Sequence, residues 1–382
     1  MIRMLTAYTE EVLDTEAAGT QILAQLDLSR NLARHAVGII SCMTEFVQTG
    51  VVKALCDRLP FDVVGCTTMG TTVQGVIRPV VLTLTVLTSE EVAFAAGITD
   101  SLEGDLAPVE ALYEELLKAL PEKPSLLIPF APFMFIGGDE FVEKLDDLSG
   151  GLPLFGMLAI AQNLHEGNIY TCYNGTCKTK ALGLLALSGP IDPLFLVSAI
   201  PQDRIIGPQA LVTEADKNVL HRVNDIRALE YLRSFGLAES GEIEGIETMP
   251  LVLELQDGSR VARACISITP EGSVVCGGDV PVGVGLSIAT IDFDDVIEST
   301  GLLIQEALRK AQGRSLFMIS CAARNWALGT DLYAEMEHVT ARIQGSMPYH
   351  FSYSGGEICP IPDRNGTPVN RFHNDALIVC IL

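Results

Sequence analysis

Six residues in the last quarter of the chain carry side chains that could together bind a small polar molecule. Arginine can form a forked pair with a carboxylate, and glutamate can hold an ammonium group. Tyrosine, histidine and asparagine supply directional hydrogen bonds, and a cysteine beside them could serve as a nucleophile. The six are Cys321, Arg324, Tyr353, Glu357, His373 and Asn374. They predict a binding site for a small polar ligand, and an amino acid fits these groups.

The places of these residues in the chain favour their convergence. Cys321 ends one apolar run, Glu357 follows a second run and two glycines, and His373 precedes the last apolar run. In open α/β sheets, binding sites lie at the carboxyl ends of strands. Glycine beside a site also permits positive φ and a close approach of backbone to a ligand. We therefore expect one site at the ends of these strands.

Each residue also has an ordinary structural explanation, which the sequence leaves open. Cys321 could be a small buried residue, or the nucleophile of a thiol enzyme with His373 or Glu357 as its base. Arg324 could simply pair with Glu357, and His373 could be a hydrogen-bonded packing residue. His350 and His373 could form a metal site only if their strands pair. The chain has no GxxxxGK[ST], HExxH or GxSxG motif.

Three segments that would position these residues share one pattern of strand, helix, strand and glycine turn. Such continuous apolar runs are typical of strands buried on both faces. In the first segment the strands are 36–42 and 61–70, with a helix between them that ends near residue 59. In the second segment the strands are 124–130 and 152–156, with a helix at 140–148. In the third segment the strands are 315–321 and 347–357, with a helix at 330–343. We expect an α/β fold of layered mixed β-sheets with covering helices, built from repeated strand-helix-strand units in two related halves.

Other elements follow from turn and periodicity signals. Val80 to Thr88 alternates Val or Leu with Thr and predicts a half-buried strand. Asn174-Gly175 predicts a two-residue hairpin turn that places Cys172 opposite Cys177. We favour two packed small residues there, with a redox-sensing pair as the alternative. Further predicted elements are a hairpin over 251–255 and 260–268, a strand at 376–382, and helices at 108–120, 226–235 and 294–312.

Composition narrows the class of protein. The 382 residues predict two domains or more, and 48 acids against 25 bases give a net charge of −23. Such a chain repels phosphate backbones, so we expect no nucleic-acid partner. No apolar stretch long enough for a membrane helix and no signal peptide is visible, so we expect no membrane insertion and a cytoplasmic location. The ten cysteines should then be free thiols.

Several segments of the chain resemble the FIST family (F-box and intracellular signal transduction proteins). The C-terminal matches are a strand ending Ser-Cys with an Arg soon after, a Tyr-to-Glu-Ile segment, and Phe-His-Asn before the last strand. The similar segments are 319–324, 353–360 and 372–377, together with 64–70 and 210–215 in the first half. The family's acid after the first glycine turn is replaced by Thr71, and a second family acid is absent from 156–161.

The resemblance implies a sensory protein with a FIST N-like domain at 1–215 and a FIST C-like domain at 216–382. It implies a cytoplasmic small-ligand sensor for intracellular signal transduction, with no catalytic or metal-binding residues, that acts through a separate signalling protein. A homo-oligomer would suit the apolar composition. We expect no cofactor. The alternatives are a haem-binding nitric-oxide sensor of the same fold, a thiol-dependent enzyme that uses Cys321, and a protein–protein scaffold.

Overall fold

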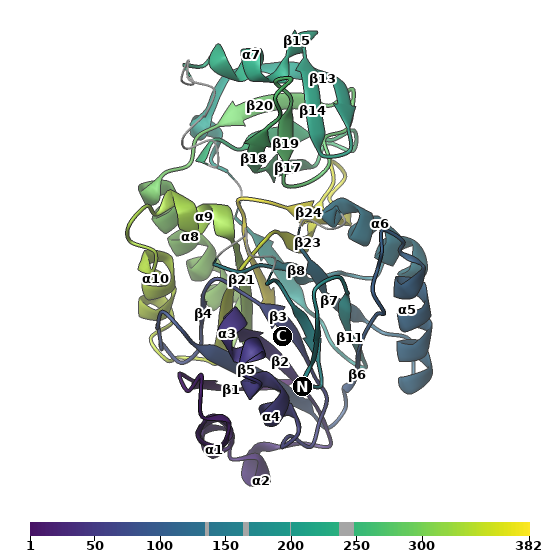
Figure 1. Ribbon diagram of the computed structural model, residues 1–382, viewed down its shortest axis with the longest axis vertical. Helices are drawn as coiled ribbons and strands as arrows, with labels where there is room; N and C mark the ends of the chain where they lie inside the picture. Colours follow the sequence, from purple (N-terminus) through teal and green to yellow (C-terminus); the bar gives the residue numbers. More distant parts are fainter. Residues whose placement is uncertain (134–136, 163–167, 199, 237–247) are drawn as a thin grey trace.

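The computed structural model describes residues 1–133, 137–162, 168–198, 200–236 and 248–382. Three mixed sheets carry helices on their outer faces, and a smaller module caps one end (Figure 1). The predicted fold class, with layered mixed sheets and repeated strand-helix-strand units, is confirmed. As expected, two repeats lie in the first half of the chain and one in the second.

The repeats have the same order of elements. The first comprises β1 (Arg3–Thr9), α1 (Thr15–Leu26), α2 (Leu28–Asn31), β2 (His35–Cys42), α3 (Thr44–Gln48), α4 (Val51–Cys56), β3 (Val63–Thr67), β4 (Thr71–Thr72) and β5 (Leu82–Ser89). The second comprises β6 (Ala93–Ile98), α5 (Ala107–Ala119), β7 (Leu126–Pro132), α6 (Gly138–Ser149), β8 (Gly156–Ala159), β9 (Thr171–Tyr173), β10 (Thr176–Lys178) and β11 (Gly183–Ser188). The third comprises β12 (Leu194–Val197), α8 (Phe293–Ala311), β21 (Leu316–Cys321), α9 (Ala322–Ala327), α10 (Ala334–Ile343), β22 (Tyr349–Ser354), β23 (Glu357–Pro362), β24 (Pro368–His373) and β25 (Leu377–Ile381).

Every repeat arranges its four main strands in one spatial order. The second and third strands are parallel and joined by helix, as in β2 and β3, β7 and β8, and β21 and β22. The fourth strand lies antiparallel beside the second, and the first lies beside the fourth. The resulting orders are β1-β5-β2-β3, β6-β11-β7-β8 and β12-β25-β21-β22. The parallel pairing confirms the three predicted strand-helix-strand units, but the second strand of the second unit begins at Gly156, where the strand expected over 152–156 was to end.

The segment after each third strand crosses to a different sheet. β4 of the first repeat pairs with β22 of the third, β9 of the second pairs with β3 of the first, and β23 of the third pairs with β8 of the second. Each repeat therefore gives strands to one neighbour and receives strands from the other. The exchange closes a ring, so no repeat completes its sheet without the others.

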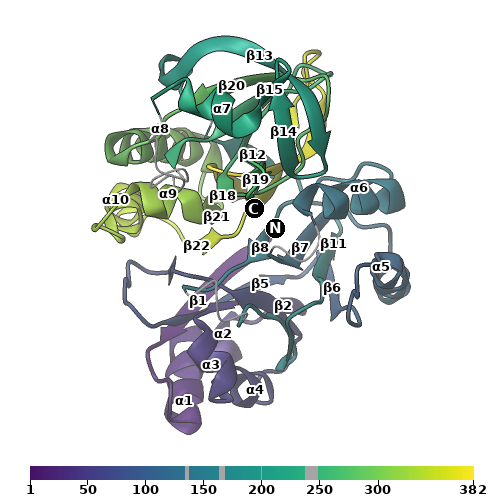
Figure 2. The same cartoon turned by 45° about the horizontal axis from the view of Figure 1, so that its top comes forward.

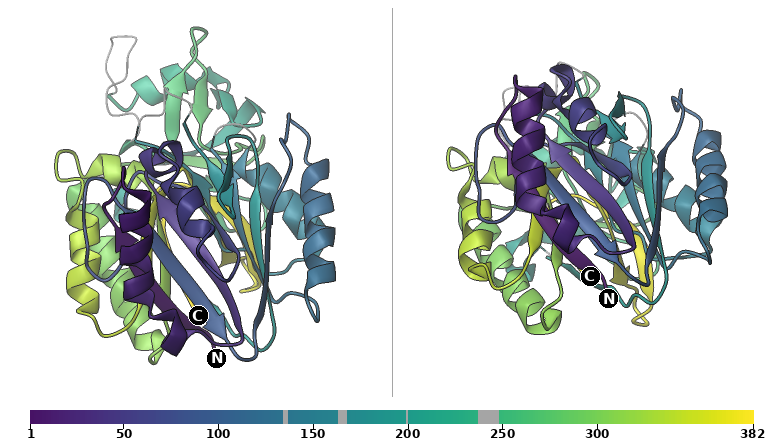
Figure 3. Two further views of the ribbon diagram at one scale, coloured as in Figure 1. Left: turned by 60° about the horizontal axis from the view of Figure 1, so that its bottom comes forward. Right: turned by 90° about the horizontal axis from the view of Figure 1, so that it is seen from below.

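The inner faces of the three sheets share one apolar core, and helices cover the outer faces. Ile39, Ile128 and Ile319 lie in that common core, one from each central strand. The outer faces pack on α1 and α4, on α5 and α6, and on α8 and α10. The three groups of helices surround the sheets on three sides when the molecule is seen from below (Figure 3). Each sheet is thus buried on both faces, which explains the continuous apolar runs.

The Ile-Ser-Cys tripeptide that two repeats share places its serine on opposite faces. Ser41 points to the inner side, where its Oγ accepts a hydrogen bond from Ser352 (3.1 Å). Ser320 points outward and donates to Glu335 Oε2 on α10 (2.9 Å). Aligning the two tripeptides therefore places equivalent residues on opposite faces of their sheets, and the two serines have unrelated roles.

β5 is buried along its whole length, so the expected half-buried strand over 80–88 is wrong. Thr83 Oγ1 lies 2.9 Å from Thr71 Oγ1, and Thr85 Oγ1 lies 2.9 Å from His350 Nδ1. Hydroxyl groups with hydrogen-bond partners can be buried without the cost of an unpaired polar group. The alternation of Thr with Val or Leu in β5 therefore reflects a strand with an apolar outer face. On its inner face, the Thr hydroxyl groups form hydrogen bonds with polar groups of other strands.

Local backbone effects explain the helix differences. The single helix expected before residue 59 is divided into α3 and α4 at Gly50, which has φ +83°. The helix expected over 226–235 is shorter, because Ile226–Arg227 pair with β14 as β15 and α7 spans only Ala228–Arg233. The short helix α9 was not predicted from the sequence. None of the helices within the described residues is both long enough and apolar enough to cross a membrane.

A module that spans residues 205–289 is inserted in the third repeat between β12 and α8 and covers one end of the sheets (Figure 2). The remaining elements of the module are β13 (Ile205–Asp216), β14 (Val219–Val223), β16 (Leu251–Glu254), β17 (Arg260–Arg263), β18 (Cys265–Ile268), β19 (Val274–Cys276) and β20 (Gly285–Ala289). The predicted hairpin is confirmed as β16 and β17, but the second strand expected over 260–268 is wrong beyond Arg263, because β18 pairs with β19 instead of continuing β17. The domain boundary between 215 and 216 falls at the end of β13 and stays a prediction.

Arg263 attaches the module to the sheets. This side chain is only 2% exposed. Its guanidinium donates to Asp139 Oδ1 on α6 (2.8 Å), to the Phe372 carbonyl of β24 (3.0 Å) and to the Asp279 carbonyl of the module (2.9 Å). Buried arginines of this kind are stable only when their donors are satisfied. The module is therefore fixed to two elements of the sheet region by one side chain.

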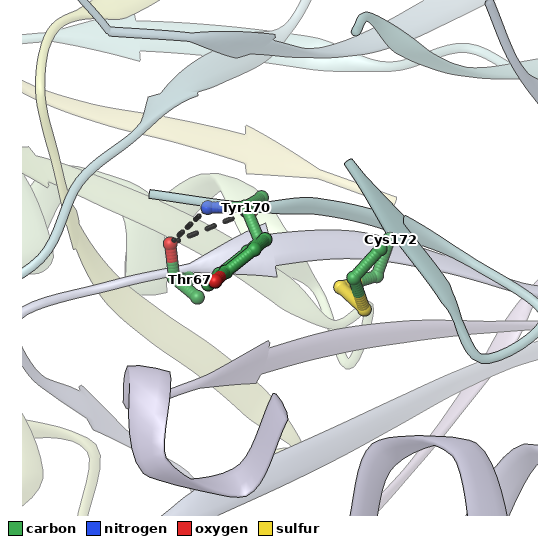
Figure 4. The surroundings of a disulfide bond; sticks show 4 residues. Thr67, Tyr170 and Cys172 are labelled. Carbon is green, nitrogen blue, oxygen red and sulfur yellow. Dashed lines mark hydrogen bonds between the residues drawn. A yellow bond between two sulfur atoms is a disulfide. The ribbon is translucent and has the colours of Figure 1, made fainter. Parts of the chain in front are cut away.

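The hairpin β9–β10 has the predicted register, with Cys172 opposite Cys177. The two residues form a disulfide, so the expectation that all ten cysteines are free thiols is wrong for this pair. The register brings the two cysteines together because a two-residue turn pairs the flanking positions in order. Eight cysteines remain free. Figure 4 shows Cys172 and its bond beside Thr67 and Tyr170.

Replacement of Gly65 should test the close packing of β2 against β3. Gly65 has φ +155°, and a Cβ atom there would lie 1.9 Å from the Ile40 carbonyl oxygen. We expect Gly65→Ala to reduce the free energy of unfolding by roughly 3 kcal/mol or more, measured by urea denaturation. Gly50→Ala is the control, because Gly50 also has positive φ but open space, and it should cost about 1 kcal/mol. Equal effects would contradict this account.

Candidate functional site

Arg324 lies at the start of α9 and pairs with Glu335 on α10, so the alternative pairing with Glu357 is wrong. Its Nε and one terminal nitrogen donate to Glu335 Oε1 at 3.0 and 2.7 Å. The same nitrogen donates to Thr300 Oγ1 on α8 (2.8 Å). Both partners of the ion pair are almost completely buried, with exposures of 2% and 0%. The guanidinium is thus engaged in joining α8, α9 and α10.

Tyr353 lies on the same outer side of β22 as this ion pair. Its ring packs edge-on against Phe351, and burial raises the pKa of its hydroxyl well above the ordinary value. The hydroxyl oxygen is buried and has no hydrogen-bond partner among the described residues. The side chains of Asn325 and Glu335 lie beside this hydroxyl and act on its pKa, so Tyr353 belongs to the polar surroundings of the Arg324 ion pair.

Cys321, Glu357 and Asp375 form a second buried group near the carboxyl ends of β21 and β22. Ser354 Oγ donates to Glu357 Oε1 (2.5 Å), while the second oxygen of this carboxyl group has no partner among the described residues. Both carboxylate oxygens of Asp375 are likewise buried without a partner. Burial raises the pKa of Asp375 to about 7 and the pKa of Glu357 well above its ordinary value.

This group disfavours a reactive thiolate at Cys321. Burial raises the pKa of the thiol, and the nearby carboxyl groups of Glu357 and Asp375 raise it further. Activated cysteines sit instead in exposed, electropositive surroundings. The environment of Cys321 is therefore that of an unreactive buried thiol.

His373 and Asn374 lie where β24 ends, directly before Asp375. The His373 Nε2–H donates to the Cys359 carbonyl (3.0 Å), and burial lowers the pKa of the imidazole to about 4, so the ring is neutral. Asn374 Oδ1 accepts a hydrogen bond from the backbone N–H of Ala264 in the module (3.2 Å). The amide of Asn374 therefore joins the C-terminal segment to the module.

A pocket of about 520 Å³ opens between the module and the last strands. Its walls come from β12, from β16 and β17 of the module, and from β23. His373, Asn374 and Asp375 form one part of the lining, and Arg260 forms another. The remaining lining residues are predominantly apolar. They include Phe195, Leu196, Val197, Val252, Val261 and Ile361. A mostly apolar cavity with few polar groups is typical of small-molecule sites.

The six predicted residues thus separate into two regions. His373 and Asn374 line the pocket, and Cys321 and Glu357 lie behind it beside Asp375. Arg324 and Tyr353 belong to the outer side of β21 and β22, packed with α8 and α10. The two regions differ because consecutive residues of a strand point to opposite faces.

Two other results concern residues outside this set. The histidine pair considered for a metal does not form, because both ring nitrogens of His350 are hydrogen-bonded to hydroxyl groups, and no group of three metal-binding side chains occurs in the described part of the chain.

Asp375 was missed as a site residue. Its signal was the run His373-Asn374-Asp375, and Asp tolerates the left-handed backbone (φ 55°) found there.

Comparisons with known proteins identify both halves of the chain. Residues 36–226 match the FIST N domain, and residues 228–360 match the FIST C domain. No curated protein matches the chain.

Three solved structures show weak likeness. Cyanuric acid hydrolase from A. caulinodans is 10% identical over 49% of this chain and 70% of its own, with a TM-score of 0.29. Another cyanuric acid hydrolase structure is 9% identical over 100% of this chain and 98% of its own (TM-score 0.32). PurLQS from Thermotoga maritima is 10% identical over 100% and 71%, respectively (TM-score 0.19). At these scores the likenesses support no argument about function.

Removal of Glu335 should reveal the structural role of the Arg324 ion pair. Glu335→Ala leaves a buried guanidinium without its carboxylate, so we expect the free energy of unfolding to fall by about 3–5 kcal/mol in urea denaturation. Glu337→Ala, on the exposed side of the same helix, is the control and should change stability by less than about 0.5 kcal/mol. A small loss for Glu335→Ala would show that the pair is not a major support.

Asp375→Asn should stabilise the protein, and more so at high pH. The folded-state pKa of about 7 lies above the ordinary value of 3.8. The folded state therefore binds more protons between these values, and stability falls as the pH rises through this range. We expect the variant to unfold at the wild-type temperature at pH 4, and to gain on the order of 4 kcal/mol at pH 8. A pH-independent difference in thermal unfolding would contradict a buried acid.

Proposed function

Because the chain belongs to the FIST family, whose domains are associated with sensory signal transduction, we propose that it is a sensor that binds a small ligand in the pocket beside His373, Asn374 and Asp375. The observation that carries the proposal is the position of Asp375 in the lining of a mostly apolar cavity, with both oxygens of its carboxylate buried directly behind that lining and without a hydrogen-bond partner among the described residues. A buried charge without a partner is costly in the free protein. A ligand that supplies a donor would remove part of that cost.

The lining favours an amino acid with an apolar side chain as the ligand. Its ammonium group would pair with Asp375 after a side-chain rotation that turns the buried carboxylate toward the cavity, since a charge-assisted hydrogen bond is the strongest interaction open to that carboxylate. Its carboxylate would reach Arg260, whose guanidinium already contacts Gln202 Oε1 (2.9 Å) and Glu254 Oε2 (3.2 Å) at the exposed side of the pocket. The apolar walls would then enclose the side chain of the ligand.

The position of the pocket suggests how binding would be transmitted. Val261 and Ala262 line it from the module, while Pro360 and Ile361 line it from β23. A ligand that touches both parts would favour one placement of the module over others, because a ligand shifts a conformational equilibrium only through differential contacts. We propose that a separate signalling protein recognises the module in the ligand-bound placement.

The haem alternative has little support from the described residues. Of the two fully buried histidines, His350 has both nitrogens engaged by hydroxyl groups, and His373 uses Nε2 for the Cys359 carbonyl. A haem held through a histidine Nε2 does not fit these contacts. The thiol-enzyme alternative is disfavoured in the same way, since burial and neighbouring acids raise the pKa of Cys321.

A cytoplasmic location and a homo-oligomeric state remain part of the proposal. The net charge of −23 supports a protein or small-molecule partner over a nucleic acid.

The test is isothermal titration of the full chain with the twenty amino acids at pH 8. We expect one class with apolar side chains to bind. Asp375→Asn should weaken that binding roughly 10- to 100-fold, through loss of a charge-assisted hydrogen bond. Asp331→Asn, an exposed acid after α9, is the matched control and should bind as the wild type does.

The pH dependence provides a second readout. A cationic group binds the ionised form of Asp375, so affinity should rise from pH 6 to pH 8 around the folded pKa of about 7. The Asp375→Asn variant should lack this rise. No binding by any amino acid, or binding that Asp375→Asn leaves intact, would contradict the proposed ligand and site.

A further inference from the structure

The disulfide of the β9–β10 hairpin is separate from the proposed ligand site, because neither Cys172 nor Cys177 lines the pocket beside His373. Cys172 and Cys177 face each other across the two strands, with their Cα atoms 4.1 Å apart. This spacing is that of a non-hydrogen-bonded antiparallel pair, in which side chains approach most closely, at about 4.5 Å between Cα atoms. The fold therefore holds the two sulfur atoms together through backbone pairing.

The turn of the hairpin is fixed independently of the disulfide. Asn174 donates its backbone N–H to the Val63 carbonyl (2.8 Å), and its side-chain oxygen accepts from the Val63 N–H (2.8 Å). The side-chain amide also donates to Asp62 Oδ1 (2.8 Å). Three hydrogen bonds thus bind one turn residue to β3 and to the residue before it.

The other end of the hairpin is fixed as well. The Thr67 N–H donates to the Tyr170 carbonyl (2.9 Å), and the Tyr170 N–H donates to Thr67 Oγ1 (3.0 Å), as Figure 4 shows in part. Cys172 itself pairs with Gly65 in β3. Because both ends are anchored, rupture of the S–S bond would leave two thiols in the same register, ready to be oxidised again.

The two sulfur-bearing residues differ in accessibility. Cys172 is 2% exposed and packs in the apolar core under α4, whereas Cys177 is only partly buried and lies on β10, the edge strand of its sheet. An attacking thiolate must reach the sulfur along the S–S axis from outside. Access therefore favours attack on Cys177, with Cys172 as the leaving group.

A third cysteine lies close to the hairpin without sharing in its bond. Cys56 on α4 lies beside the Gly175 backbone of the turn, and burial raises the pKa of its thiol to about 11. Cys56 is therefore a neutral thiol at physiological pH, and neutral thiols are poor nucleophiles. Exchange should involve an external thiol and not Cys56.

We propose that Cys172 and Cys177 form a reversible thiol–disulfide exchange site whose substrate is an external dithiol. One thiolate of the dithiol attacks Cys177 Sγ, so an S–S bond forms between them and the Cys172–Cys177 bond breaks. Cys172 leaves as a thiolate and takes up a proton. The second thiolate of the dithiol then displaces Cys177, which is also protonated. The dithiol becomes a disulfide, and the protein holds two thiols.

The experiment uses the folded full chain. It is treated with 1 mM dithiothreitol, alkylated and digested, and the cysteine peptides are measured by mass spectrometry. We expect Cys172 and Cys177 to become labelled and the buried Cys42 and Cys66 to remain unlabelled. In a second sample, which receives oxidised glutathione after reduction and before alkylation, the pair should escape labelling. Persistence of the bond until the protein is denatured, or failure of the reduced pair to re-form it, would overturn the proposal.

Two matched single variants test the assigned direction of attack. With oxidised glutathione, Cys172→Ser should form a mixed disulfide at Cys177, whereas Cys177→Ser should leave Cys172 at least tenfold less modified. Equal modification of the two would refute the preference for Cys177. Cys56→Ser should leave the exchange unchanged.

The double variant Cys172→Ser/Cys177→Ser tests the independence of the hairpin from its bond. Its melting temperature should lie within a few degrees of the value for the wild type. Loss of folding would identify the disulfide as a structural element and would overturn the proposal.

Discussion

The three repeats depend on one constraint, which is that every central strand must be buried on both faces. An apolar strand such as β2, β7 or β21 cannot leave either face in water, and no single repeat can cover its own inner face. The three sheets bury their inner faces in one shared core, which contains Ile39, Ile128 and Ile319. Helices cover the outer face of each sheet. The strand exchange among β4, β9 and β23 then follows as a way of completing each sheet with residues of a neighbour.

This arrangement separates the polar residues of the third repeat into two regions. On the outer side, Arg324 and Glu335 form a buried ion pair that joins three helices. On the inner side, Glu357 and Asp375 remain without full hydrogen bonding, next to a pocket that the inserted module closes. Satisfied polar groups stabilise a fold, whereas unsatisfied ones store free energy that a ligand can release. The proposed sensing function rests on that difference.

The inserted module gives the third repeat a property that the first two lack. It is held by Arg263 and by the backbone of Ala264, which donates to Asn374. The same C-terminal segment therefore contacts both the module and the pocket. A change in the charge of Asp375 would act next to the contact between Asn374 and Ala264 of the module, because Asp375 directly follows Asn374 in the chain.

Much of the architecture was determined by local sequence pattern. Apolar runs and helix periodicity predicted the three strand-helix-strand units, and Asn174-Gly175 predicted the hairpin register that places Cys172 opposite Cys177. The sequence also indicated the C-terminal segment as part of a site, and the structure places His373 and Asn374 in a pocket lining. These features depend on residues close together in the chain, whose pattern reports directly on burial and turn geometry.

Only the tertiary structure decided which face each side chain occupies and what it meets there. The serines of the two Ile-Ser-Cys segments lie on opposite faces of their sheets. β5 is buried on both faces, and Arg324 pairs with Glu335 instead of Glu357. A shift of one residue moves a side chain to the other face of a sheet, and the partners there come from elements remote in sequence. The same reason explains why Asp375 could not be recognised as an unpaired acid from its neighbours alone: its lack of a partner is a property of the whole fold.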